Sequence, residues 1–133
     1  MKNRICLLMI LLFSLNSFAS DDYMNAKIGI WCESSDGGKT CLGYETFYDD
    51  GTFTSVGTDI LYDVGYRVRG TWALDGNKAC MTVIEYFSYD LITNQEIPPP
   101  NIEVLCGEIL YLDDEIYKYK TGEGKIETMY RVN

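Results

Sequence analysis

Apolar and polar residues alternate along most of the chain, in short runs that end at glycine, aspartate, asparagine or proline. A two-residue period is that of a β-strand, because successive side chains point to opposite faces. The clearest run is YRVRGTWAL at 66–74, whose one face carries Tyr66, Val68, Gly70, Trp72 and Leu74. The pattern predicts an all-β chain of antiparallel strands.

Aspartate–glycine pairs divide these runs into hairpins. Asp75-Gly76 separates the run at 66–74 from the run at 78–88, and Asp50-Gly51 separates two further runs. Both residue types accept the positive φ that a tight reversal needs. The near-repeat of DGGKTC and DGNKAC, each after a Gly-x-Trp, is therefore interpreted as a turn followed by a cysteine on the returning strand.

Further strands are predicted, with one long connection between two of them. The connection is YDLITNQEIPPP at 89–100, which we expect to be a surface loop because three consecutive prolines cannot donate to a sheet. Residues 21–27 allow a short helix. The further strands are DILYDV (59–64), NIEVLCGEILYL (101–112), EIYKYKT (115–121) and KIETMYRV (125–132). About eight strands with short links predict an up-and-down meander, forming a closed or partly open barrel.

Residues 1–19 have the pattern of a secretory signal peptide. Lys2 and Arg4 flank the start of an apolar run that is too short to span a bilayer, and Ser17 and Ala19 supply the small residues of a cleavage site. An uncleaved anchor is the alternative. We expect residues 20–133 to form one domain of a periplasmic or secreted bacterial protein, with no membrane span once the signal is removed.

Cysteine usage predicts two disulfides. Cys6 leaves with the signal, and an even number of cysteines in a small exported domain is typical of a disulfide framework. Four cysteines allow three pairings; the favoured one joins Cys32 to Cys41 across the first reversal and Cys80 to Cys106 on adjacent strands. Zinc is disfavoured, because the chain has no Cys-x-x-Cys pair and no histidine.

The chain is acidic, with a net charge of −9 that becomes −11 when Lys2 and Arg4 leave with the signal. Such a surface repels nucleic acid and anionic lipid, and it suits either solubility or a basic partner such as a lysozyme. The absence of histidine removes the commonest general base. We expect no enzymatic activity, no cofactor and no metal, since the aspartates at 48–51 and 112–115 are explained as turn residues.

Both ends of the chain resemble lipocalins and their calycin relatives. Gly29-Ile30-Trp31 stands at the entry to the first strand, and the last strand carries Arg131. In that group a Gly-x-Trp opens the first strand, and an Arg or Lys near the end of the last strand packs over the Trp and seals the barrel. The FYDDGTF and RGTWAL hairpins are similar to those of small bacterial lipocalin-like domains. The resemblance implies that Gly29, Trp31 and Arg131 form the barrel floor.

A lipocalin-like barrel implies a binding protein that holds a small apolar or amphipathic ligand. Glu45, Glu85 and Glu108 lie in predicted strands, and a carboxylate that faced the interior would have a raised pKa and could bind a cation. The alternative is a strand edge, a bulge or a salt bridge to Arg67 or Arg69. Tyrosine suits a pocket but is also an ordinary strand residue. The ligand candidates are Tyr66, Trp72, Tyr86, Glu108, Tyr117 and Tyr119.

Overall fold

Nine strands account for most of residues 22–133, the part of the chain that the computed structural model describes. A short helix at 22–27 precedes the first strand. The strands are β1 (Gly29–Glu33), β2 (Gly43–Phe47), β3 (Thr52–Asp59), β4 (Val64–Asp75), β5 (Lys78–Asp90), β6 (Glu96–Ile97), β7 (Val104–Leu112), β8 (Ile116–Thr121) and β9 (Ile126–Arg131). The signal peptide expected at 1–19 lies outside the described residues.

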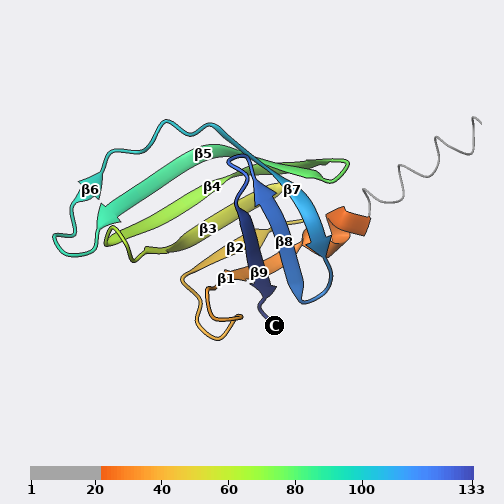
Figure 1. Cartoon of the computed structure of the whole chain (residues 1–133). Coiled ribbons are helices and arrows are strands. Elements are labelled where there is room, and N and C mark those ends of the chain that lie inside the picture. The colour runs from red at the N-terminus through yellow and green to blue at the C-terminus, as the bar shows by residue number, and fades with distance from the viewer. Residues whose placement is uncertain (1–21) are drawn as a thin grey trace, which may run out of the picture.

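The strands form a closed antiparallel barrel (Figure 1). Each strand pairs with the next along the chain, except that β5 pairs with β7 beyond the two-residue β6, and β1 pairs with β9. Eight strands thus complete the circle, and β6 adds only to the end of β5. The predicted all-β, up-and-down meander is confirmed.

The predicted hairpin around Asp75-Gly76 is confirmed. β4 and β5 pair from Asp75↔Lys78 to Val64↔Asp90. Gly76 has a φ of 61°, which the reversal requires and which glycine adopts without steric cost. At the β2–β3 turn Gly51 has a φ of 81°, so the same chemistry serves a second hairpin.

The strand predicted at 59–64 is wrong. β3 ends at Asp59, β4 begins at Val64, and the residues between them form a turn. The Asp59 carboxylate accepts a hydrogen bond from the Leu61 amide at 3.0 Å, and Asp63 has a φ of 53°. The apolar residues in this run suggested a buried strand. Leu61 is instead 83% exposed, so the run forms a turn outside the core.

The loop predicted at 89–100 is shorter than expected. β5 continues to Asp90, and β6 pairs with Ser88 and Tyr89. The three prolines follow directly and form no strand, as their missing amides require.

Both predicted disulfides are confirmed. Cys32 of β1 is bonded to Cys41 across the first reversal, and Cys80 of β5 is bonded to Cys106 of β7. Cys80 and Cys106 are also direct partners in the β5–β7 register. Disulfides indicate an oxidising, exported location.

The apolar core occupies one part of the barrel interior. It is centred on the floor cluster, which we define as Trp31, Phe47, Phe53, Trp72 and Met129, each at most 4% exposed. Phe47 joins its neighbours by a stacked contact with Phe53 at 6.2 Å and an edge contact with Trp72 at 5.4 Å. Polar and charged side chains join apolar ones in the rest of the interior.

Candidate functional site

Trp31 and Arg131 lie together at the barrel floor. They are direct partners in the β1–β9 register, and the Arg131 guanidinium carbon lies 4.3 Å from the centre of the indole ring. Trp31 is 0% exposed. The guanidinium therefore gains a cation–π contact and covers the indole.

Arg131 also ties the last strand to the helix that precedes the first. Its guanidinium donates to the carbonyls of Ala26 and, at 2.8 Å, Ile28, while its Nε donates to the Asp114 carbonyl at 2.6 Å. The last carbonyls of a helix have no partner within the helix. One side chain thus satisfies the Ala26 carbonyl in the last turn of the helix and joins three segments.

Gly29 makes room for this arrangement. Its φ is +132°, in a region that L side chains rarely adopt, and a Cβ there would overlap the Arg131 guanidinium. Two residues later the Trp31 indole donates to the Lys27 carbonyl at 2.8 Å. The Gly-x-Trp spacing is thereby explained: the glycine admits the guanidinium, and the tryptophan packs beneath it.

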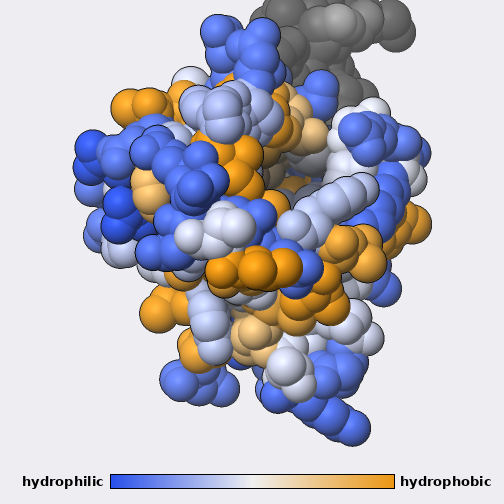
Figure 2. All heavy atoms as spheres, turned by 90° about the vertical axis from the view of Figure 1, so that its left-hand side faces the viewer, coloured by the Kyte–Doolittle hydropathy of each residue, from blue (hydrophilic) through white to orange (hydrophobic). Residues whose placement is uncertain are grey.

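A cavity of about 500 Å³ adjoins the floor cluster. Its apolar wall comes from β5 and β7, and its polar wall comes from the helix, β2, β8 and β9. Apolar lining residues include Ala79, Met81 and Leu105, and polar ones include Lys27, Glu45, Tyr117, Tyr119 and Glu127. We call this space the interior cavity. Figure 2 views the barrel from the side of β6 and shows a hollow bordered by both apolar and polar residues.

Lys27 faces the interior cavity from the helix and is only 1% exposed. Its ammonium lies 3.7 Å from the Phe47 ring centre and 3.8 Å from that of Tyr117. Within residues 22–133 it forms no hydrogen bond and no ion pair. Burial lowers its pKa to about 7, against the opposing attraction of Glu45.

Glu45 faces the same cavity from β2. Burial raises its pKa; Lys27 opposes that rise, and the like charges of Glu33 and Glu127 add to it. No carboxylate oxygen of Glu45 comes within 4.0 Å of the Lys27 ammonium. The two groups therefore attract each other without direct contact.

Two more carboxylates lie near Glu45. Glu33 accepts a hydrogen bond from the Tyr66 hydroxyl at 3.4 Å, and burial followed by the charge of Glu127 raises its pKa. Glu127 lines the cavity and pairs with Lys125 at 2.6 Å. Lys125 is largely exposed, so this pair belongs to the cavity rim.

Tyr117 and Tyr119 form an aromatic wall of the cavity. Their rings stack with centres 4.9 Å apart, and Tyr117 meets Trp31 edge-on at 5.8 Å. Burial raises the pKa of both phenols, so they stay neutral donors. The wall therefore links the cavity directly to the floor.

The other predicted ligand residues lie elsewhere. Trp72 is buried in the floor cluster, and Tyr86 packs against the core without lining the cavity. Tyr66 reaches Glu33 from inside. Of the predicted set, only Tyr117 and Tyr119 line the interior cavity.

Glu108 does not face the interior, and the expectation that it would is corrected. It is exposed on the outer face and accepts a hydrogen bond from the Asn77 amide at 3.3 Å. The inward residues of β7 are its neighbours Gly107 and Ile109, and the register shifts just beyond them. Leu110 shares the outward face of Glu108 and is 43% exposed. Sharing a strand face with an apolar residue therefore did not indicate that Glu108 points inward.

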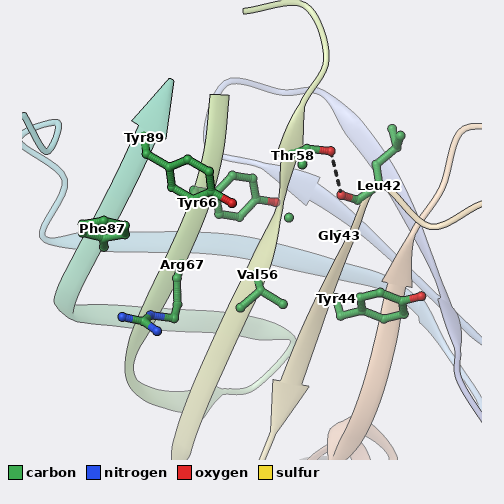
Figure 3. A pocket seen from close by; sticks show the side chains of 10 residues that line it. Leu42, Gly43, Tyr44, Val56, Thr58, Tyr66, Arg67, Phe87 and Tyr89 are labelled. Atoms are coloured by element: carbon green, nitrogen blue, oxygen red, sulfur yellow. Dashed lines mark hydrogen bonds between the residues drawn. The ribbon is translucent and has the colours of Figure 1, made fainter. Parts of the chain in front are cut away.

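A second hollow, of about 430 Å³, lies on the outer face over β2–β5 (Figure 3). Tyr44, Val56, Arg67 and Phe87 are consecutive cross-strand partners along it. We call it the outer groove. Its ring and arginine side chains are open to solvent, and it presents no buried charged group.

The barrel wall beneath the outer groove is thin. Gly43 and Gly57 are paired and have no side chains, and the Tyr66 hydroxyl lies against both. A Cβ on Gly57 would come within 2.6 Å of that hydroxyl. The two glycines therefore provide the space in which Tyr66 extends toward Glu33.

Among residues 22–133 no group of acidic, histidine or cysteine side chains is arranged to hold a metal ion. In the same part of the chain no helix has the length and apolar character needed to cross a membrane.

Solved structures share the architecture, two Bacteroides proteins among them, whereas no protein-family model and no curated protein sequence matches the chain. One is a lipocalin-like protein from Bacteroides uniformis, 14% identical with a TM-score of 0.54. The other is an uncharacterized protein from Bacteroides eggerthii, 12% identical with a TM-score of 0.52. In both comparisons the match covers 80% of this chain and 99% of the other. The chain therefore has a lipocalin-like fold.

Proposed function

We propose that this protein is an exported, non-enzymatic binding protein that holds one small amphipathic molecule in the interior cavity. The observation that carries the proposal is the cavity itself: about 500 Å³ of space beside a sealed floor, with apolar and polar walls facing each other. Ligand sites in proteins are typically concave, mostly apolar and furnished with a few polar groups. The lipocalin-like fold is consistent with a binding role.

The disulfides and the signal-like residues 1–19 support a periplasmic or secreted location. Non-enzymatic binding is favoured because Lys27 and Glu45, the inner charged groups of the cavity, do not contact each other as a nucleophile and its base would.

A neutral fluorescent probe tests the proposal. N-phenyl-1-naphthylamine brightens in apolar surroundings, and we expect saturable binding to the purified, disulfide-bonded protein. Leu105→Trp places a large ring at a lining position and should weaken probe binding at least tenfold. Its matched control is Leu110→Trp, on the outer face of the same strand, at a residue of similar exposure (43% against 44%).

Unchanged probe binding in Leu105→Trp, or equal losses in both variants, would place the probe outside the cavity and contradict the proposal. Thermal denaturation of both variants confirms that each is folded before the affinities are compared.

A further inference from the structure

The interior cavity contains more carboxylates than cations. Glu45, Glu123 and Glu127 line it, against Lys27 and Lys125. Glu127 is paired with Lys125 at the rim and Glu123 is exposed, which leaves Glu45 and Lys27 as the charged groups of the inner part. Glu33 lies outside the lining and adds a like charge near Glu45. Glu45 forms no hydrogen bond or ion pair within residues 22–133. A carboxylate withdrawn from water without a partner favours either protonation or a cation beside it.

Lys27 shows that the cavity wall accepts a cation beside aromatic rings. Its ammonium lies against the faces of Phe47 and Tyr117, and such faces attract positive charge. The aromatic wall continues along the cavity through Tyr119, which stacks on Tyr117.

An anionic ligand fits these observations less well. Its carboxylate would have to approach Lys27, whose ammonium is covered by the rings of Phe47 and Tyr117. It would also meet the charges of Glu45 and Glu127 on the same lining. A cation meets those charges favourably, and the protein's overall negative charge attracts it from solution.

We propose that the interior cavity selects amphipathic organic cations, with the cationic nitrogen of the ligand beside Glu45 and its apolar part along Met81, Leu105 and Tyr119. The selectivity rests on the proposed function, because it concerns the same cavity. The Glu45 carboxylate is already partly withdrawn from bulk water in the folded protein, so a cation gains its attraction with little new desolvation of the protein group.

Displacement of N-phenyl-1-naphthylamine by three eight-carbon compounds tests the inference: octyltrimethylammonium, octanol and octanoate, all at 0.15 M salt and pH 7.5. We expect octyltrimethylammonium to bind at least tenfold more tightly than octanol, and octanoate to bind most weakly. Equal displacement by the cation and the alcohol, or stronger displacement by octanoate, would overturn the selectivity while leaving the proposed function intact. Failure of all three, with no probe binding, would overturn both.

Glu45→Gln should reduce the preference for the cation over the alcohol to less than threefold and leave octanol binding nearly unchanged. The control is Glu85→Gln, at an exposed carboxylate that pairs with Arg69 on the outer face; it should keep the full preference. If Glu45→Gln does not fold, the pH dependence of octyltrimethylammonium binding to the unmodified protein still tests whether a carboxylate is the partner.

The charged and titratable groups that face Glu45 are Lys27 on the helix, Glu33 on β1, Tyr66 on β4, Tyr117 and Tyr119 on β8, and Glu127 on β9. Octyltrimethylammonium cannot titrate, so its affinity should rise with pH as the raised pKa of Glu45 is passed, while octanol binding stays flat. A flat profile for both compounds would contradict a carboxylate partner.

Discussion

The floor cluster and the interior cavity lie side by side in one barrel, yet they are built on opposite principles. In the floor, Trp31, Phe47 and Trp72 are closely packed, and the polar atoms around them are hydrogen-bonded to main-chain partners. In the cavity, Lys27 and Glu45 face open space without touching. The first arrangement is what stability requires; the second lowers stability and makes sense where a ligand completes it.

The largest expected loss of stability comes from a substitution in the floor cluster. Trp31→Ala removes a fully buried indole together with the surface on which Arg131 lies, and it should lower the free energy of unfolding by about 3–5 kcal/mol. Met81→Ala is the matched change in the cavity wall. Because Met81 is only partly buried and already borders open space, that change should cost about 2 kcal/mol, the low end for such truncations. Guanidinium denaturation measures both, and equal losses would remove the distinction between the two regions.

The second prediction concerns the ammonium of Lys27, which lies between the floor cluster and the interior cavity. Lys27 in the unfolded chain holds its proton up to its ordinary pKa of 10.5, whereas in the folded protein its pKa is about 7. Between these values the unfolded state binds more protons, so stability rises with pH. The free energy of unfolding should increase by about 3 kcal/mol between pH 6.5 and 9.5, at about 1.36 kcal/mol per unit.

Lys27→Met should abolish that rise, and parallel pH profiles for the variant and the unmodified protein would contradict it. Glu45 acts in the opposite direction and at lower pH. Its folded pKa is raised above 4.5, so the folded state holds the extra proton there and stability falls as pH increases through that window.

The smallest effect should come from Tyr66→Phe. The hydroxyl donates to Glu33 over 3.4 Å, and its loss should cost about 0.5–1 kcal/mol. This hydrogen bond stabilises the charged carboxylate, so removing it should raise the pKa of Glu33 further. Carboxyl chemical shifts followed through a titration would report the change; an unchanged or lower pKa would contradict the role of the hydroxyl.

Sequence predicted the fold well where the signals are local. Alternation in 66–74 and the turn at Asp75-Gly76 set the central hairpin, because period and turn chemistry act over a few residues. The favoured disulfide pairing, one of three that four cysteines allow, rested on the first predicted reversal and on two predicted adjacent strands, and it is the one observed. The run at 59–64 failed because its aspartates form the turn while its apolar residues remain exposed.

The candidate site was harder to predict. Lys27 precedes the first strand in a helix too short to show a period, so nothing in the sequence indicates that its ammonium enters the barrel. Glu45 carried a usable signal, since it shares strand parity with the buried Phe47. Glu108 was placed inward because Leu110 has the same parity, although both are exposed. Strand parity groups residues onto the same face, but which face points into the barrel is known only from the closed sheet.

The paired glycines at 43 and 57 have a consequence for how such a barrel could be redesigned. A methyl group on Gly57 would displace the Tyr66 hydroxyl, which in turn would be pushed away from Glu33. Two positions that contribute no side chain of their own thus control how Tyr66 meets Glu33 beneath the outer groove. Enlarging these smallest residues is therefore a direct way to move Tyr66 without changing Tyr66 itself.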